Sequence, residues 1–212
     1  MNCIAPRIAA LLAPLLLLAG CAVLPGQPAI ETIESREWRQ VVSDADESRL
    51  RTWRSTFGAA LAEARDKGYG AQVDALGAVG DPDLLLGLGP VPEGDFRCRT
   101  IKLGTQGGGT LAYVDYPWFD CRIRPEEDLF GLAKLTGSQR PVGLLFPDDA
   151  YRQVFLGTLV LGDEDRAMRY GADPQRDMIG ALQRIGDNHY RLIIPEPRYE
   201  SRLDIIELVP EV

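Results

Sequence analysis

The sequence predicts an α+β protein: a short N-terminal helical layer followed by an antiparallel β-meander or small barrel-like sheet with one disulfide. Three observations predict this class. Apolar residues recur at helical spacing near residues 43–64. From Gly94 onward, short runs rich in aromatic and β-branched residues alternate with turn residues. Two cysteines, Cys98 and Cys121, lie in the first and third of these runs.

The helical pattern has a recognisable start and end. Ser43 or Asp44 can cap a helix, because a side-chain oxygen at that position accepts a hydrogen bond from a main-chain N–H. Apolar residues then follow at intervals of three or four: Leu50, Trp53, Phe57, Leu61 and Ala64. Gly68 and Gly70 end the pattern, and a second, weaker helical segment is expected over residues 72–78.

Eight or nine short strands are expected in the rest of the chain. The candidate ranges are 96–103, 110–116, 118–124, 130–135, 142–146, 151–161, 178–185, 190–194 and 203–209. Turn residues separate nearly all of them, as in Thr136-Gly137-Ser138 and Gly186-Asp187-Asn188. Short strands with close turns are typical of a meandering sheet or a small barrel.

The first twenty residues predict a lipoprotein signal peptide. A head that carries Arg7 precedes the uncharged apolar run 8–18, which is shorter than the about 20 residues of a membrane-spanning helix. Leu18-Ala19-Gly20-Cys21 then matches a lipobox, in which small residues enter the peptidase and the thiol accepts diacylglycerol. An ordinary signal peptide followed by a chance cysteine is the alternative.

The predicted domain organisation follows from this N-terminus. Residues 1–20 are the signal peptide, 21–36 a lipidated tether, and 37–212 a single α+β domain. Cys21 is the expected lipid attachment site, so the membrane is an expected partner through this anchor. The protein would face the periplasm of a bacterial envelope, and Ala22 after the lipidated cysteine favours the outer membrane.

The composition and the cysteines narrow the possible partners. A net charge of −8 argues against nucleic acid, whose phosphates require a basic surface. With Cys3 removed and Cys21 acylated, Cys98 and Cys121 form an even pair, which in an oxidising compartment is typical of a disulfide. Two free thiols or half of a zinc site are the alternatives, but His189 is the single histidine and no CxxC spacing occurs. We expect no metal and no cofactor.

Eight segments carry a resemblance to a known family. The segments are Phe96–Gly104, Phe119–Ile123, Lys134–Pro141, Val154–Thr158, Arg176-Asp177, Gly180, Arg184–Gly186 and Leu203-Asp204. In this order they resemble a proteobacterial family catalogued as domain of unknown function 4893, over residues 38–210. The sequence departs from the family at His189-Tyr190, where an Arg-Trp pair is expected. The resemblance implies a periplasmic lipoprotein and implies no activity.

Patterns for catalysis are weak, and we assign no catalytic residue. The strand-to-helix elbow Gly-x-Ser-x-Gly is absent, and Ser138 with His189 would make a triad only if the fold brought them together. A glycosidase needs a pair of carboxylates, and calcium needs clustered oxygen ligands. The candidates for either role are Asp163, Glu164, Asp165, Asp173 and Asp177. Consecutive acids on a turn are usually solvated, and Gly107–Gly109 precedes a strand, so it favours a hairpin tip over a phosphate loop.

A group of cationic and polar residues is the candidate binding site. Its members are Arg97, Arg99, Arg122, Lys134, Ser138, Gln139 and Arg140, with Arg124 nearby. Arginine forks recognise carboxylates and phosphates. The alternative is cross-strand pairing with the many acids, which contributes about 0.2–1 kcal/mol per pair.

The expected function is therefore a non-enzymatic one. We expect a lipid-anchored binding module for an envelope protein or a small amphiphilic ligand. One alternative is a hydrolase that acts on envelope glycans through Asp163, Glu164 or Asp177. Another is a structural subunit of an envelope complex.

Overall fold

The computed structural model describes residues 36–107 and 109–211. The predicted signal peptide, Cys21 and the predicted tether up to residue 35 lie outside the described residues. Within the described part of the chain, no helix is both long enough and apolar enough to cross a membrane.

The helical layer comes first, as predicted, but the single helix expected over residues 43–64 is two helices that meet at Thr52. Ser43 caps the first of them, since its Oγ accepts a hydrogen bond from the main-chain N–H of Asp46 at 3.3 Å. Gly68 has a φ of 93°, a conformation that favours glycine, and there the chain turns into the last helices. The elements are α1 (Trp38–Val41), α2 (Asp44–Arg51), α3 (Trp53–Ala64), a π-helical turn η1 (Arg65–Tyr69), α4 (Gly70–Ala75) and a 3-10 helix η2 (Gly77–Gly80).

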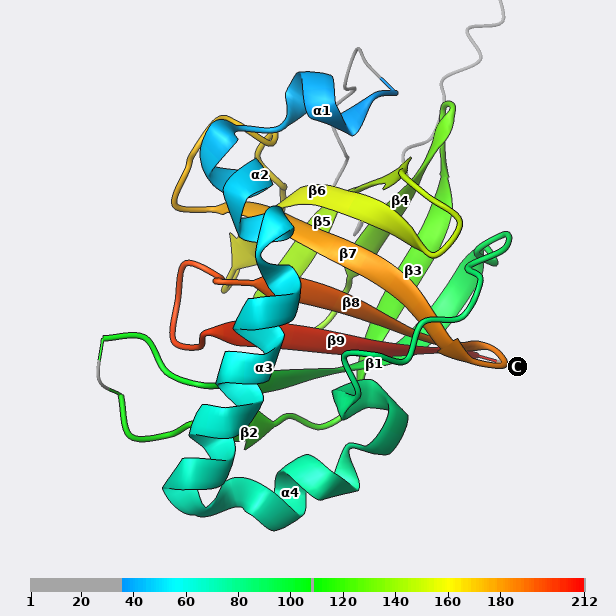
Figure 1. The fold of residues 1–212 in the computed structure, drawn as a ribbon. Coiled ribbons are helices and arrows are strands. Elements are labelled where there is room, and N and C mark those ends of the chain that lie inside the picture. Colours follow the sequence, from blue (N-terminus) through cyan, green and yellow to red (C-terminus); the bar gives the residue numbers. More distant parts are fainter. Residues whose placement is uncertain (1–35, 108, 212) are drawn as a thin grey trace, which may run out of the picture.

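Nine strands follow, and each overlaps one of the nine predicted ranges. They are β1 (Gly94–Leu103), β2 (Tyr113–Asp115), β3 (Phe119–Glu126), β4 (Leu129–Lys134), β5 (Gln139–Pro147), β6 (Arg152–Leu161), β7 (Asp177–Gly186), β8 (His189–Pro195) and β9 (Leu203–Pro210). All the pairings are antiparallel, and strands β3 to β9 pair in chain order. The predicted α+β class is thus confirmed (Figure 1).

The sheet closes on itself because β1 pairs with both β3 and β9. The pairing with β9 runs from Phe96 opposite Pro210 to Leu103 opposite Leu203. The first half of β1 pairs with β3 and its second half pairs with β2, so β2 continues the line of β3 along β1. Strands β1 and β3 to β9 therefore form an eight-stranded antiparallel barrel.

The barrel interior is a packed apolar core that contains the disulfide. Cys98 on β1 and Cys121 on β3 are linked, as predicted, and both belong to this core. Phe96, Phe155 and Leu192 are among the other core residues. Such a filled interior is usual for eight strands, which enclose room for side chains or for one small ligand.

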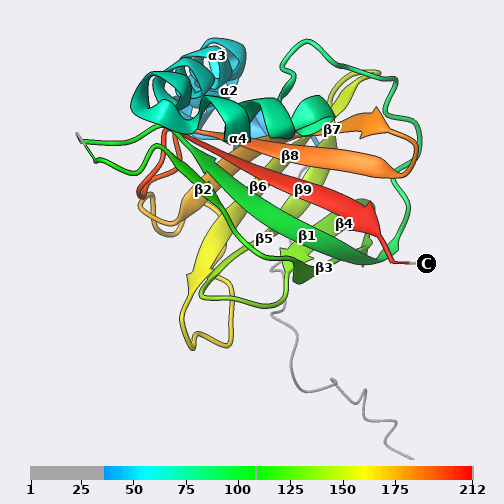
Figure 2. The same cartoon turned by 90° about the horizontal axis from the view of Figure 1, so that it is seen from below.

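The helices cover part of the outer wall of the barrel (Figure 2). Phe57 on α3 packs with Ile205 on β9, in a cluster that also draws residues from α4, β1 and β8. Leu50 on α2 packs with Leu156 on β6 in a second cluster over β5, β6 and β7. The barrel is thus apolar on both sides of these strands, which explains why their sequences read as continuous apolar runs.

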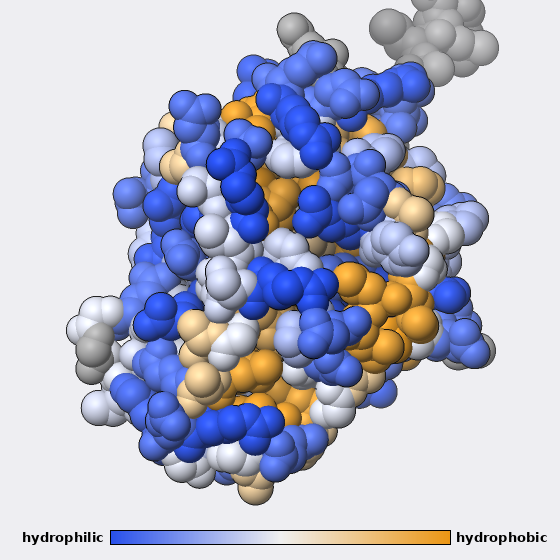
Figure 3. Space-filling view, viewed as in Figure 1, coloured by the Kyte–Doolittle hydropathy of each residue, from blue (hydrophilic) through white to orange (hydrophobic). Residues whose placement is uncertain are grey.

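The segment between η2 and β1 closes one end of the barrel. Leu86 forms a bridge with Arg184 near the end of β7, and the N–H of Leu88 donates to the carbonyl of Ala150 in the β5–β6 turn at 2.8 Å. Leu88 and Val91 join the interior core. Apolar side chains gather over this segment on the surface (Figure 3). The opposite end of the barrel is left for the loops that follow β1, β4, β6 and β8.

Candidate functional site

A cavity of about 170 Å³ lies at this second end of the barrel. Its walls come from the last residues of β1 and β4 and the first residues of β5, β7 and β9, together with the β8–β9 loop. The volume is close to that of an engineered apolar cavity of roughly 150 Å³ that holds a benzene molecule. The cavity therefore has room for a small ligand or for one end of a larger one.

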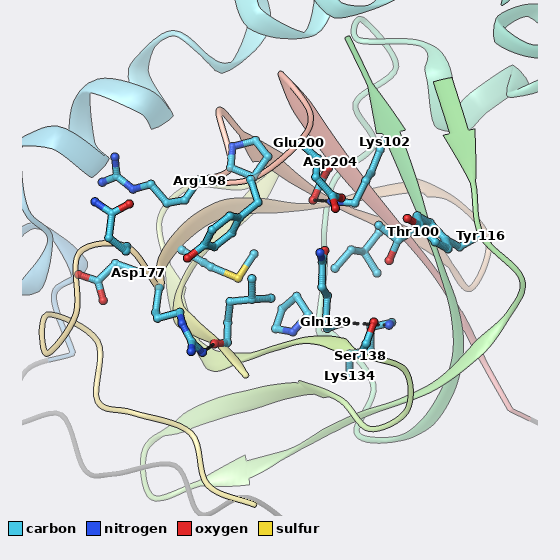
Figure 4. A pocket seen from close by; sticks show the side chains of 18 of the residues that line it. Thr100, Lys102, Tyr116, Lys134, Ser138, Gln139, Asp177, Arg198, Glu200 and Asp204 are labelled. Atoms are coloured by element: carbon cyan, nitrogen blue, oxygen red, sulfur yellow. Dashed lines mark hydrogen bonds and ion pairs between the residues drawn. The ribbon is translucent and has the colours of Figure 1, made fainter. Parts of the chain in front are cut away.

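The lining of the cavity is amphiphilic. Leu159, Met178 and Ile206 contribute apolar surface from β6, β7 and β9. Four basic and three acidic side chains also line it, and these are Lys102, Lys134, Arg176, Arg198, Asp177, Glu200 and Asp204. Figure 4 shows Lys134, Ser138 and Gln139 together at one side, and Lys102 with Glu200 and Asp204 at another.

Lys102 is a buried cation with acidic partners. Its side chain is 6% exposed, and its Nζ donates to Asp204 Oδ2 at 2.9 Å and lies 3.3 Å from Glu200 Oε2. Burial alone would lower the pKa of Lys102, but attraction to Asp204 and Glu200 raises it above its ordinary value. The hydroxyl of Ser201 also donates to Asp204. This group is a satisfied ion pair, and a ligand need not neutralise it.

Lys134 is a buried cation without an acidic partner. It is 4% exposed, and no carboxylate in the described part of the chain lies within 4.0 Å of its Nζ. The Nζ donates to the carbonyl of Gln139 at 3.0 Å and lies 3.7 Å from the centre of the Phe119 ring. Burial, with the nearby charges of Arg140 and Lys102, lowers the pKa of Lys134 to about 8.

Lys134→Met is expected to stabilise the protein at pH 7 by about 1 kcal/mol, because it replaces a buried, unpaired charge with an apolar side chain of similar length. The folded pKa of about 8 lies below the ordinary 10.5. The desolvation cost is therefore fully present below pH 8 and disappears as the pH rises to about 10.5. Urea unfolding at pH 7 and at pH 10 measures how much the free energy of unfolding of the variant exceeds that of the unchanged protein. This difference should be smaller at pH 10.

The matched contrast is Lys102→Met, which should destabilise the protein because it removes the cation that faces Asp204. A gain in the free energy of unfolding of Lys134→Met that is equal at the two pH values would contradict the depressed pKa of Lys134.

The β6–β7 loop is fixed at the rim of the cavity by an ion pair. Arg176 donates to both carboxylate oxygens of Glu164 at 3.0 Å and to the carbonyl of Leu159 at 2.9 Å. Hydrogen bonds from Arg176 and from the N–H of Leu161 lower the pKa of Glu164 to about 2. Arg140 donates to the carbonyls of Gly137, Gly162 and Glu164, and so joins this loop to the β4–β5 turn.

The structure divides the predicted binding residues into two groups. Lys134, Ser138 and Gln139 line the cavity, whereas Arg140 is engaged by loop carbonyls behind it. Arg97, Arg99 and Arg122 do not line the cavity. They alternate along β1 and β3 with the core residues Cys98 and Cys121, and this places them on the outer wall of the barrel.

Acids and one aromatic ring hold the outer arginines. Arg99 pairs with Asp115 at 2.8 Å and with Glu207 at 2.5 Å, and Arg122 pairs with Asp95 at 2.5 Å. The guanidinium groups of Arg97 and Arg99 lie 5.0 and 5.4 Å from the centre of the Trp118 ring. For Arg99 and Arg122, this arrangement is the cross-strand pairing that the sequence analysis left as the alternative.

The acidic residues of the hydrolase hypothesis do not meet in the cavity. Asp163 and Asp165 are exposed, and Glu164 is held by Arg176, with a pKa too low for a general acid. Asp177 does line the cavity, and its carboxylate accepts a hydrogen bond from the N–H of Gly171 at 2.9 Å. In the described residues, no three His, Cys, Asp or Glu side chains form a group that could hold a metal ion.

Most residues of the cavity were missed by the sequence analysis, and Lys102 and Asp204 are two buried charged examples. Lys102 and Asp204 face each other across β1 and β9, and neither belongs to the predicted binding group. A signal for Lys102 was present in the sequence. Only three lysines occur, and two of them, Lys102 and Lys134, interrupt apolar strand segments. A lysine between apolar neighbours on a strand either points to solvent or marks a polar site inside.

Fold and site together define a class of protein: a small closed antiparallel barrel, covered by helices on part of its wall, with an amphiphilic cavity at one open end. The chain belongs to the family described as Domain of unknown function (DUF4893), whose match covers residues 38–208. The predicted family is thereby confirmed. No curated protein and no solved structure matches the chain significantly.

Proposed function

We propose that the protein is a lipid-anchored envelope protein that binds a small amphiphile in the end cavity of its barrel, without chemical conversion. The observation that carries this proposal is the amphiphilic lining. Leu159, Met178 and Ile206 offer apolar contact, and the unpaired amine of Lys134 lies beside them in the same cavity. Ligand sites commonly combine mostly apolar walls with a few placed polar groups.

The free-energy cost of burying the charge of Lys134 supports a role for this residue in ligand binding. A buried charge without a counter-ion lowers the stability of the folded state, and a core of apolar residues would be more stable. Residues that break such a local rule are concentrated at functional sites. Lys134 is therefore more readily explained as a ligand contact than as a structural element of the barrel.

The first described residues contact the closed end of the barrel. Arg36 forms an ion pair with Asp128 in the β3–β4 turn, and Trp38 Nε1 donates to Asp148 in the β5–β6 turn at 3.0 Å. Both turns lie at the closed end of the barrel, away from the cavity.

Thr100→Tyr is expected to weaken the binding of a short amphiphile at least tenfold. Thr100 lines the cavity from β1 and is only half-buried, so a larger side chain fills the cavity without entering the packed core. Isothermal titration calorimetry with hexanol measures the effect, and we expect a loss of at least tenfold in affinity.

The control for Thr100→Tyr is Thr110→Tyr, the same change at an exposed position outside the cavity. It should bind hexanol as the unchanged protein does. Equal binding by both variants would refute the cavity as the site, and the absence of any hexanol binding to the unchanged protein would refute the proposal itself.

A further inference from the structure

We infer that the polar end of the ligand is a carboxylate, a single negative charge that pairs with the amine of Lys134. This inference rests on the proposed function, because it names the chemical class of the molecule that the cavity binds.

The other three cations of the cavity already have acidic neighbours. Lys102 is paired with Asp204. Arg176 is paired with Glu164, and its two hydrogen bonds occupy both carboxylate oxygens. The nearest acid to Arg198 is Asp46, with 3.8 Å between Arg198 Nη2 and Asp46 Oδ1.

Lys134 differs from these cations in having only neutral partners. Its ammonium group has three N–H donors, and the described residues accept one hydrogen bond from it, at the carbonyl of Gln139. The face of the Phe119 ring is its other contact. An anion in the cavity would give the remaining donors an acceptor and would neutralise the buried charge.

The surroundings favour a monoanion over a phosphate. Asp177, Glu200 and Asp204 line the same cavity and would repel a second negative charge. Lysine offers a point charge, whereas Arg176, which could hold a phosphate as a fork, is engaged by Glu164. The volume of about 170 Å³ suits a carboxylate with a short apolar chain beside Leu159 and Met178.

Binding should depend on pH through the protonation of Lys134. The charged and titratable groups around it are Lys102 on β1, Tyr116 before β3, Arg140 on β5, Arg176 and Asp177 at the start of β7, Asp204 on β9, and Arg198, Tyr199 and Glu200 in the β8–β9 loop. Only the ammonium form attracts a carboxylate, and the pKa of Lys134 is about 8. Affinity should therefore be nearly constant below pH 7 and fall about tenfold between pH 7 and pH 9.

The test is calorimetric titration of the purified protein with hexanoate, hexyl phosphate and hexanol at pH 7 and pH 9. We expect hexanoate to bind more tightly than the other two at pH 7 and to weaken about tenfold at pH 9. Hexanol, which is uncharged, should bind equally at both. Lys134→Met should lose at least tenfold in hexanoate affinity and keep its hexanol affinity, while Lys67→Met, on the surface, should change neither.

Lys134→Arg adds a readout that a purely structural role would not change. An arginine keeps its charge at pH 9, so any hexanoate binding to this variant should lose its dependence on pH. Tighter binding of hexyl phosphate, or equal hexanoate binding by Lys134→Met, would overturn the inference. Suppose that hexanol binds and Thr100→Tyr blocks this binding, but hexanoate binds no more tightly than hexanol. The proposed function then stands and this inference alone fails. If neither hexanol nor hexanoate binds, the proposed function and this inference both fail.

Discussion

Arg191→Met is expected to lower the free energy of unfolding by about 3–5 kcal/mol, because it leaves several buried hydrogen-bond acceptors without a donor. Arg191 on β8 is 0% exposed. Its Nη1 donates to the carbonyls of Ala78, Val79 and Asp81 at 2.6–3.1 Å, and its Nη2 donates to the carbonyl of Leu84 at 3.0 Å. The guanidinium thus satisfies carbonyls at the C-terminal end of η2 and attaches the end of the helical layer to the barrel.

The chemistry of the substitution explains the size of this effect. Methionine retains the apolar stem but has no N–H, so the carbonyls of Val79 and Leu84 lose their donor, as does Gln183 Oε1, which accepts from Arg191 Nε at 3.0 Å. The carbonyls of Ala78 and Asp81 keep only a long main-chain hydrogen bond each, at 3.4 and 3.3 Å. Each buried acceptor left without a donor costs about 1–3 kcal/mol. Burial lowers the pKa of Arg191 to about 10, so the group stays charged at neutral pH and the loss should be visible there.

Urea denaturation followed by circular dichroism measures the effect of Arg191→Met. The matched control is Arg54→Met, since Arg54 also contacts the segment after η2, through the carbonyl of Pro82 at 3.1 Å, but from an exposed position. An exposed pair contributes about 0–1 kcal/mol, so this variant should remain close to the unchanged protein. Similar losses in the two variants would contradict the role assigned to Arg191.

Gly143→Ala is expected to destabilise the barrel by about 3 kcal/mol or more, at or above the upper end of the range for overpacking a core. Gly143 on β5 faces Gly157 on β6. A Cβ at position 143 would meet the carbonyl oxygen and carbon of Leu156 and the Cα of Gly157, with only 2.8 Å to the carbon. All three are main-chain atoms, so no change of rotamer relieves the contact, and two paired strands would have to separate.

Gly58→Ala is the control for Gly143→Ala, because it makes the same change with the opposite expected sign. Gly58 lies in the middle of α3, where an added Cβ meets nothing within 4 Å. Alanine there should stabilise the protein by about 0.5–1 kcal/mol, since glycine loses more backbone freedom in a helix. Thermal and urea unfolding measure the stability of the two variants. Destabilisation by Gly58→Ala, or none by Gly143→Ala, would contradict this account of packing at β5 and β6.

Local patterns predicted the secondary structure well, for reasons that local physics explains. The helical spacing of Leu50, Trp53 and Phe57 and the cap at Ser43 depend on residues only a few positions apart. The turns between strands likewise depend on neighbouring residues such as Gly137 and Asn188. The break at Thr52 was missed, because no glycine or proline marks it and the apolar spacing continues across it.

The candidate site was predicted only in part, because membership of a cavity depends on strand direction and on closure. Lys134, Ser138 and Gln139 are close in sequence, and one turn brings them to the cavity together. Arg97, Arg99 and Arg122 lie on neighbouring strands, but their pleat directs them outward. Lys102 and Asp204 are 102 positions apart and meet only because β1 pairs with β9.

The sequence by itself therefore determined the elements, the disulfide between Cys98 and Cys121, and the family. Those features follow from short-range periodicity, from the count of cysteines and from ordered motifs. Only the tertiary structure decided that the sheet closes and which lysine lacks a counter-ion. The reason is physical: closure joins the two ends of the strand region, and the pKa of Lys134 depends on burial and on charges that distant strands supply.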